Sequence, residues 1–131
     1  MWLERNVMSK HKSISKKKRL LVYDKCNGHC AYCGCELEYK DMQVDHIESV
    51  WANVEWKANK TLDEINDLSN LMPSCRMCNF YKSSASLEKF RQNLTEVLMP
   101  NVRKPFDYRL ALKYGLIEEH IKPITFYFET L

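Results

Sequence analysis

Two cysteine pairs with the same spacing place the strongest constraint on how this chain can fold: CAYC at residues 30–33 and CRMC at residues 75–78. This spacing lets two thiolates converge on one ion from a single turn, and two such pairs complete a tetrahedron of sulfur atoms. We therefore predict one structural zinc site, whose ligands are Cys30, Cys33, Cys75 and Cys78. A closed four-sulfur site offers no position for water, so this zinc would stabilise the fold without taking part in catalysis.

The compartment expected for the chain favours metal over disulfides. Residues 1–19 contain no apolar run before a small-residue cleavage site, so we predict no secretory signal and a cytoplasmic location. In that reducing environment, paired cysteines bind metal or carry out redox chemistry more often than they form disulfides. Buried free thiols are the alternative, and a thioredoxin-like redox role would need two copies of the motif. Cys26 and Cys35 lie outside the predicted site.

Length and composition fit one domain in solution. The chain has 131 residues, of which 45% are hydrophobic and 28% charged, and this length suits a single core over residues 1–131. No apolar run is long enough to cross a bilayer, so we predict no membrane partner. Within the domain we place a basic arm at 1–14, a metal-binding core at 28–82, and a helical extension with a final strand at 83–131.

Local signals predict the elements of the N-terminal half. Ser15 suits the N-cap of a helix over 16–26, which the Asn27-Gly28 pair would end. Residues 37–47 alternate in polarity and predict strands with a hairpin at Lys40-Asp41. Thr61 and Glu64 form a capping-box pattern ahead of a short helix.

The C-terminal half reads as helices followed by a strand. A helix begins at the second cysteine pair, and another follows Ser86 and ends at Pro100. The apolar positions of this second helix, which helical spacing assigns to a core, are Leu87, Phe90, Leu94, Val97 and Leu98. Asp107 suits the N-cap of a third helix that Gly115 ends, and residues 123–128 predict a final strand.

Asp45 and His46 lie between the cysteine pairs at the end of a predicted strand. Side chains of consecutive strand residues point to opposite faces, so these two would have different roles. A half-buried histidine and a turn-capping aspartate are the alternative interpretation. The residues after each cysteine pair, Gly34 and Asn79, suit the left-handed backbone that closes such a turn.

Several motifs occur in one order over residues 28–82: NGHCAYCG, DHI, NL and CxxCNxxK. This order resembles the HNH endonuclease family, the ββα-metal nucleases. The resemblance implies two strands and a helix around one catalytic divalent ion, with a structural zinc beside it. It predicts an α+β fold: a small ββα-metal core with two CxxC zinc knuckles, flanked by an N-terminal helix, C-terminal helices and a short strand.

The resemblance also assigns roles by position. His46 matches the general base and Asp45 the metal-binding carboxylate, while Asn70 matches the asparagine that braces the loop and orients the histidine. Asn79 matches the second ligand of the catalytic ion, and the alternative is a residue that only closes the zinc turn. Lys82 stands at the family's lysine position, where it would contact phosphate or lie on the helix surface.

The implied activity is hydrolysis of DNA phosphodiester bonds, by nicking or double-strand cutting, in a bacterial or phage-infected cell. Two oxygen ligands leave several positions for water and phosphate on a hard ion, so the expected catalytic cofactor is Mg²⁺ or Mn²⁺. The alternative is a zinc-ribbon module that binds nucleic acid without catalysis. Departures from the family pattern begin after His46, where Ser49 replaces a common proline and the following loop lacks glycine.

Basic residues predict contact with a polyanion through counterion release. The predicted nucleic-acid contacts are Lys16, Lys17, Lys18, Arg19, Arg76 and Lys82. The alternative for the N-terminal cluster is a solvated helix start. Trp51 and Trp56 would either face DNA or pack their loop onto the domain.

Overall fold

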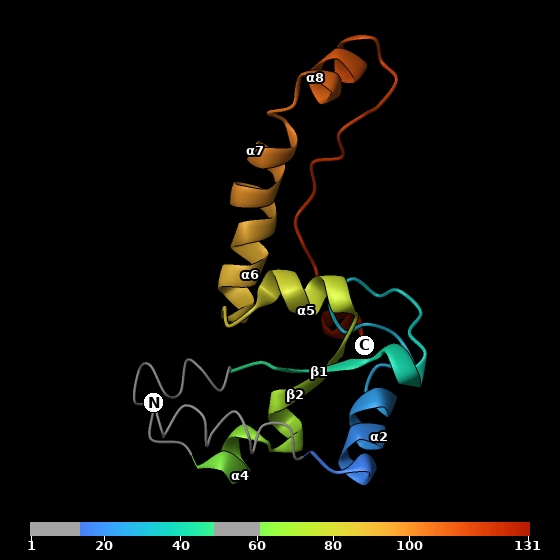
Figure 1. The fold of residues 1–131 in the computed structure, drawn as a ribbon, viewed down its shortest axis with the longest axis vertical. Coiled ribbons are helices and arrows are strands. Elements are labelled where there is room, and N and C mark those ends of the chain that lie inside the picture. The colour runs from blue at the N-terminus through green and yellow to red at the C-terminus, as the bar shows by residue number, and fades with distance from the viewer. Residues whose placement is uncertain (1–13, 49–60) are drawn as a thin grey trace. The chain divides into compact units, whose positions relative to one another are not determined.

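The computed structural model describes residues 14–48 and 61–131, and these residues belong to two compact units (Figure 1). Unit 1 consists of Met1–Leu87 and Thr125–Leu131, and unit 2 consists of Glu88–Ile124. The end of the chain therefore groups with the cysteine-containing part and not with the helices that precede it. Our division at residues 14, 28 and 82 stays a prediction.

The first helix of unit 1 is α2 (Lys16–Asp24), and its ends have the predicted signals. The Ser15 side chain accepts a hydrogen bond from the Lys18 backbone N–H at 3.1 Å, which satisfies one of the unpaired donors of the first turn. Asn27 and Gly28 follow with positive φ angles of 54° and 77°, so the helix stops where their conformational freedom allows the turn.

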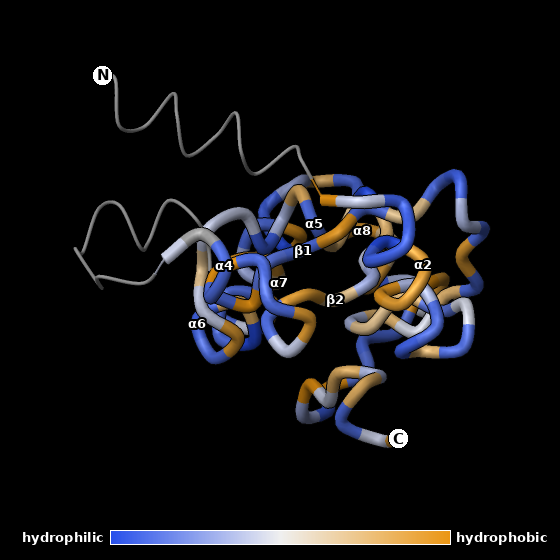
Figure 2. Tube along the Cα trace, turned by 90° about the horizontal axis from the view of Figure 1, so that it is seen from below, coloured by the Kyte–Doolittle hydropathy of each residue, from blue (hydrophilic) through white to orange (hydrophobic). Residues whose placement is uncertain are grey.

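An apolar cluster holds α2 against the rest of unit 1. Its buried members are Val22, Leu37, Met42 and Leu71. They come from α2, from the segment after the first cysteine pair and from the second strand, so the cluster joins parts of the chain that are distant in sequence. Figure 2 shows the corresponding hydrophobic stretches in α2 and β2. Burial of such side chains contributes roughly 1.5–3 kcal/mol each.

Two short strands and a helix follow one another in the order that the resemblance implies. Strand β1 (Gln43–His46) pairs antiparallel with β2 (Leu71–Ser74). In the register of this sheet, Asp45 lies opposite Met72 and His46 opposite Leu71. Helix α5 (Arg76–Lys82) begins directly after β2. The α+β prediction of a small ββα core is therefore confirmed.

The predicted hairpin at Lys40-Asp41 is wrong. Residues Tyr39–Asp41 form a 3₁₀ turn, η1, and no strand precedes β1 within the described residues 14–48. The Met42 N–H bonds the carbonyl oxygens of Glu38 and Tyr39, which closes a tight turn instead of a ladder. The partner of β1 comes from β2, far along the chain, and period-two alternation cannot identify a partner at that distance.

The connection between β1 and β2 ends in two short helical turns, α4 (Leu62–Ile65) and η2 (Leu68–Asn70). The predicted capping contact is present, because the Glu64 N–H donates to the Thr61 hydroxyl oxygen at 3.2 Å. Asp67 caps η2 by accepting from the Ser69 N–H at 3.0 Å. Trp51 and Trp56 lie outside the described residues.

Helix α6 (Leu87–Asn93) starts one residue before unit 2 and continues through a π-helical stretch, η3 (Leu94–Leu98), into α7 (Met99–Val102). Pro100 therefore does not end the helix as predicted. It lies at the start of α7, where proline's missing N–H costs little because the π-helical stretch already interrupts the regular hydrogen-bond pattern. Helix α8 (Phe106–Lys113) starts after Pro105, one residue before the predicted cap at Asp107.

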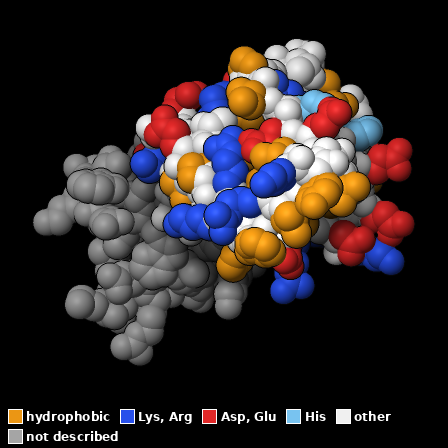
Figure 3. Space-filling view, turned by 90° about the horizontal axis from the view of Figure 1, so that it is seen from above, with side chains coloured by type: hydrophobic (Ala, Val, Ile, Leu, Met, Phe, Trp, Pro, Cys, Tyr) orange, Lys and Arg blue, Asp and Glu red, His pale blue; other side chains and the backbone are white. Residues whose placement is uncertain are grey.

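The apolar positions predicted for the helix that runs through α6 and η3 are only partly buried. Phe90 is buried, but Val97 is 46% exposed and Leu98 is 36% exposed. Figure 3 shows hydrophobic side chains standing among Lys and Arg side chains on one face of the molecule. Helical spacing identifies the apolar side of a helix, but it does not show whether another element packs against that side. No helix within residues 14–48 and 61–131 combines the length and apolar character that crossing a bilayer requires.

The predicted final strand at 123–128 is wrong. The chain is irregular up to Phe126 and then forms a 3₁₀ turn, η4 (Tyr127–Thr130). Phe126 is nonetheless buried, and its ring meets the Tyr32 ring edge-on at 5.3 Å. The Tyr127 N–H donates to the Tyr32 carbonyl at 3.1 Å and the Phe128 N–H to the Ala31 carbonyl at 2.9 Å. The segment thus forms backbone hydrogen bonds with the turn of the first cysteine pair. That turn is too short to act as the partner strand of a sheet.

Candidate active site and metal centre

The four predicted zinc ligands meet in space. The Sγ atoms of Cys30, Cys33, Cys75 and Cys78 all lie within 4.8 Å of one another. Cys75 is the N-cap of α5, so the second pair lies in the first turn of that helix. Two backbone donors already point at sulfur: the Cys75 N–H lies 3.3 Å from the Cys30 Sγ, and the Cys78 N–H lies 3.4 Å from the Cys75 Sγ.

The cluster fits a structural metal ion such as zinc. Four thiol ligands at mutual contact form the donor set that zinc prefers, and the backbone N–H groups stabilise the thiolate form that binds it. A hydrogen bond from Cys78, assisted by backbone N–H groups, lowers the pKa of Cys30 to about 4. Cys26 is buried, while Cys35 is exposed, and both lie outside the four-sulfur group.

The two residues predicted to close the cysteine turns differ. Gly34 has a φ of 79°, as predicted for the turn after the first pair. Asn79, by contrast, lies inside α5 with ordinary helical geometry, so it does not close a left-handed turn. The reason is that the second pair opens a helix, and the residue after Cys78 continues that helix. This leaves the Asn79 side chain for another role.

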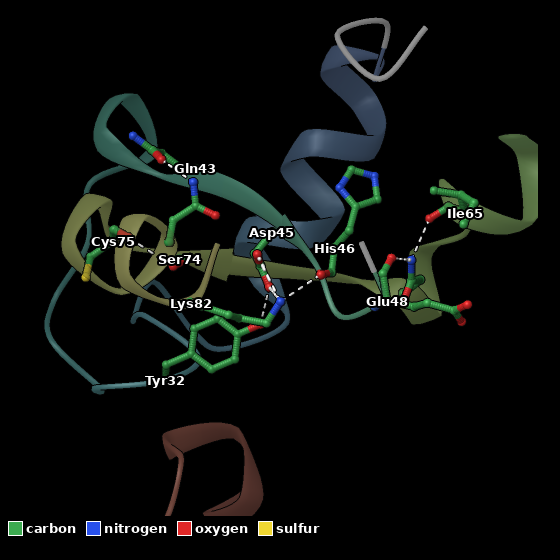
Figure 4. Close-up of polar contacts among 11 residues, drawn as sticks. Tyr32, Gln43, Asp45, His46, Glu48, Ile65, Ser74, Cys75 and Lys82 are labelled. Atoms are coloured by element: carbon green, nitrogen blue, oxygen red, sulfur yellow. Dashed lines mark hydrogen bonds and ion pairs between the residues drawn. The ribbon is translucent and has the colours of Figure 1, made fainter. Parts of the chain in front are cut away.

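Asp45 has two partners inside the protein. Its carboxylate lies 3.1 Å from the Lys82 ammonium and accepts a hydrogen bond from the Tyr32 hydroxyl (Figure 4). The side chains of Lys82 and Asp45 are 0% and 4% exposed, so both charges lie out of water. Burial raises the pKa of Asp45 above its ordinary value, although Lys82 and Tyr32 oppose the shift.

Lys82 is therefore part of the interior and not of the surface. Its ammonium also donates to the His46 carbonyl oxygen at 3.0 Å. The sequence left two interpretations, a phosphate contact or a helix-surface lysine, and this placement agrees with neither. The physical reason is that β1 packs against α5 and brings an acceptor pair within reach of the amine at the end of that helix.

Gln43 and Asn79 make a second contact between the same elements. The Asn79 side-chain N–H₂ donates to the Gln43 side-chain oxygen at 2.6 Å. Gln43 and Asp45 are two residues apart on β1, so they share the face that α5 covers. The Asn79 side-chain oxygen has no hydrogen-bond partner among the residues that the structure describes.

The oxygen donors of Asp45 and Asn79 fit a hard divalent ion in their chemistry. A carboxylate offers about four lone-pair sites, and the amide oxygen of Asn79 accepts no hydrogen bond from residues 14–48 or 61–131, so both can accept a further partner. The charge of Lys82 opposes such an ion, because the ammonium already neutralises Asp45 at 3.1 Å. A divalent ion there would have to share the carboxylate with the lysine.

His46 leaves β1 on the other side from the Asp45 cluster (Figure 4), in keeping with the predicted alternation. Its imidazole is buried, and its Nε2 atom lies 2.8 Å from the side-chain oxygen of Asn66. Burial lowers the pKa of His46, and the hydrogen bond to Asn66 opposes the shift. Sequence reasoning missed Asn66 and Tyr32, because Asn66 lies outside the motifs, Tyr32 occupies a variable position between Cys30 and Cys33, and both reach the site through the fold.

Asn70 holds the chain where it leaves β1. Its side-chain oxygen accepts from the Glu48 N–H at 2.8 Å, and its N–H₂ donates to the carbonyl oxygens of Glu48 at 3.0 Å and Ile65 at 2.8 Å. One amide thus ties the end of β1 to the end of α4. The role that the resemblance attributes to Asn70 stays a prediction.

The predicted nucleic-acid contacts fall into two groups. Lys16, Lys17 and Arg76 are exposed, so they remain available to a polyanion. Lys18 and Arg19 instead bond backbone carbonyl groups: the Lys18 ammonium donates to the Asn66 carbonyl at 2.7 Å, and Arg19 donates to the Met42 carbonyl at 2.5 Å. The charge run is thus divided by the helix into an outer and an inner face.

A groove of about 1010 Å³ adjoins the site in unit 1. Gln43, Cys75 and Arg76 line one part of it. Acidic side chains, among them Glu36 and Asp41, line it as well, so the groove has mixed charge.

Comparison with known proteins gives a family. A family model described as HNH endonuclease matches residues 30–84. Septu protein PtuB from Bacillus thuringiensis is 27% identical over 110 residues, which cover 79% of this chain and 36% of that protein. This chain thus spans about a third of the length of the curated relative it matches. No solved structure matches significantly. The motifs and the ββα core agree with this match, so residues 30–84 resemble the HNH endonuclease family in both sequence and fold.

Proposed function

We propose that this chain is a metal-dependent endonuclease that hydrolyses phosphodiester bonds in DNA. The observation that supports this best is the placement of Asp45 and His46 on the strand of a ββα core that lies in the family-matched segment. Their side chains have separate partners, Lys82 for Asp45 and Asn66 for His46. An acid and a base that are held apart can perform two functions at one phosphate.

His46 is the proposed general base. Burial lowers its pKa, so the ring is neutral at neutral pH and can take a proton from the attacking water. Lys82 holds the backbone of His46 through the carbonyl oxygen, and Asn66 holds the ring through Nε2. The base is thereby fixed at both ends of the residue.

The proposed catalytic cofactor is Mg²⁺ or Mn²⁺, held by the side-chain oxygens of Asp45 and Asn79. When bound, such an ion neutralises charge on the phosphate and on the departing 3′-oxygen. The products would then be 5′-phosphate and 3′-hydroxyl ends. Zinc in the four-cysteine site has the separate role of joining the two cysteine turns. Lys16, Lys17 and Arg76 are the proposed phosphate contacts outside the site.

The deciding experiment is cleavage of supercoiled plasmid by the zinc-loaded full chain with Mg²⁺, Mn²⁺ or excess EDTA. We expect nicked or linear product with a divalent ion, and a loss of about 10²–10⁴-fold in rate for His46→Ala, the usual contribution of a general base. His120→Ala is the matched control, because His120 is an exposed histidine in unit 2. Uncut plasmid under every metal condition, or equal cleavage by His46→Ala and the wild type, would refute the proposal.

One observation favours a second candidate, a zinc-stabilised module that binds nucleic acid without cutting it. The ion pair between Lys82 and Asp45 satisfies the carboxylate inside the protein, as a purely structural site would. The two candidates separate in a binding assay on the same preparations. A non-catalytic module retards DNA in a gel and leaves it intact with every divalent ion, and His46→Ala binds as tightly as the wild type.

A further inference from the structure

The side chain of Asn66 contacts the imidazole of His46. Its oxygen lies 2.8 Å from Nε2, and an amide oxygen can only accept a hydrogen bond. The hydrogen in this contact therefore belongs to Nε2 of the ring. In a neutral imidazole one nitrogen carries the hydrogen and the other has the basic lone pair, so this contact makes Nδ1 the basic nitrogen.

The backbone around Asn66 is fixed at three successive residues. The Asn70 side chain donates to the Ile65 carbonyl at 2.8 Å, Lys18 donates to the Asn66 carbonyl at 2.7 Å, and the Asn70 backbone N–H donates to the Asp67 carbonyl at 2.8 Å. These contacts come from η2 and from α2, so they join separate elements of the core. A side chain on such a backbone can hold its partner in one orientation.

Asn70 contacts the backbone, whereas Asn66 contacts the ring of His46. The three hydrogen bonds of its side chain go to backbone groups of Glu48 and Ile65. Asn70 thus sets the path of the chain, and it also fixes the carbonyl group just before Asn66. The family resemblance assigned the orientation of the histidine to Asn70, whereas in the structure the side chain of Asn66 contacts the ring.

We propose that Asn66 is a positioning residue for His46: it holds the ring in one orientation, with hydrogen on Nε2 and the basic lone pair on Nδ1, and Lys18 holds Asn66 in place. The inference rests on the proposed function, since it assigns Nδ1 as the atom that takes the proton from water. It also gives Lys18 a role inside the protein in place of the predicted contact with nucleic acid.

The direct test is a measurement of the His46 tautomer by long-range ¹H–¹⁵N NMR on the zinc-loaded full chain at a pH where the ring is neutral. The chain contains 4 histidines. The His46 signals are the ones that disappear from the spectrum of His46→Gln. We expect hydrogen on Nε2 in the wild type and a mixture of tautomers in Asn66→Ala. Hydrogen on Nδ1 in the wild type, or an unchanged tautomer in Asn66→Ala, would overturn the proposal.

Cleavage kinetics give the second test. Asn66→Ala should lower kcat by about tenfold or more, a part of the contribution of a general base, with little change in KM. Asn66→Asp keeps an accepting oxygen, so it should restore the Nε2–H tautomer and recover part of the rate. Asn101→Ala is the matched control, because Asn101 is an exposed asparagine in unit 2. Equal rates for Asn66→Ala and Asn101→Ala would contradict the proposal.

A pair of lysine variants tests the anchoring of Asn66. Lys18→Met removes the bond to the Asn66 carbonyl and should shift the tautomer in the same direction as Asn66→Ala, to a smaller extent. Lys17→Met removes an exposed neighbour on the same helix and should leave the His46 signals unchanged. Identical spectra for the two lysine variants would remove Lys18 from the proposal. If the wild type cuts no DNA, the proposed function fails, while the NMR result still decides the role of Asn66.

Discussion

At the scale of single residues, the buried ion pair between Lys82 and Asp45 dominates the energetics of the site. Among the described residues, Lys82 is the largest that is fully buried. Its ammonium donates to the Asp45 carboxylate and to the His46 carbonyl oxygen. Removing one member of such a pair leaves the other charge buried without a partner. The pair is therefore costly to break, even though its net contribution relative to an apolar pair is small.

We expect Lys82→Met to lower the free energy of unfolding by about 3–5 kcal/mol, the cost of an uncompensated buried charge. Asp45→Asn should cost a similar amount, and the double variant should cost clearly less than the sum of the two. Chemical denaturation of the zinc-loaded proteins measures all three. Lys17→Met is the control, and its exposed side chain should change stability by less than about 0.5 kcal/mol. Additive single-variant costs would show that the two charges do not interact.

Residue type and spacing were sufficient to predict part of the site. The four cysteines are identifiable because their chemistry requires a fixed spacing, and the Asp45-His46 pair because of its motif. The partners of that pair could not be identified in this way. Tyr32, Asn66 and the buried ammonium of Lys82 reach the site through the packing of β1 against other elements, and no local pattern encodes these contacts.

At the scale of elements, the C-terminal segment matters more than its lack of regular structure suggests. Phe126 is 1% exposed and packs against Tyr32, which in turn bonds Asp45. Backbone bonds from Tyr127 and Phe128 hold the turn of the first cysteine pair. The segment therefore supports both the metal centre and the proposed active site from outside the family-matched range of 30–84.

We expect Phe126→Ala to destabilise unit 1 by about 3–5 kcal/mol, the usual cost of removing a buried phenylalanine. The measurement is chemical denaturation followed by the fluorescence of the chain, together with zinc content before unfolding. Phe106→Ala is the matched control, because Phe106 is 65% exposed and its loss should change stability by less than about 0.5 kcal/mol. Equal effects of the two variants would show that the C-terminal segment does not stabilise the core.

Helices α2 and α5 were predicted correctly from local signals, whereas the final strand and the helix stop at Pro100 were not. Helix α2 has a side-chain cap and a glycine stop, and α5 starts at a cysteine pair that must turn. The final strand failed because alternating apolar residues also occur where single side chains are anchored in a core. The stop at Pro100 failed because a π-helical stretch before it had already interrupted the hydrogen-bond pattern that a proline would break.

At the scale of the whole molecule, the four-cysteine cluster joins segments that lie far apart in the chain. Cys30 and Cys33 precede β1, whereas Cys75 and Cys78 follow β2. A metal ion bound by all four would therefore link the two ends of the segment that contains both strands. Binding free energy of a structural metal contributes directly to folding when the site exists only in the folded state. Unit 1 should therefore depend on its metal.

We expect metal analysis to find about one zinc per chain, retained in mild EDTA, and strong chelation to unfold unit 1. Cys30→Ser removes a ligand and should cause the same loss of structure, measured by circular dichroism and NMR. Cys35→Ser is the matched control, because Cys35 lies outside the cluster, and this variant should keep both its zinc and its fold. A folded, metal-free Cys30→Ser would contradict the structural role of zinc.

The order of the units along the chain has a consequence for how such proteins can diversify. Unit 2 departs from unit 1 after Leu87 and the chain rejoins unit 1 at Thr125, so for the core it is an insertion between two fixed points. The entropic cost of closing an insertion rises by only about 0.6 kcal/mol for each doubling of its length. Such a core can therefore exchange one insertion for another, and with it one set of exposed apolar side chains for another, while the residues around Asp45 and His46 stay the same.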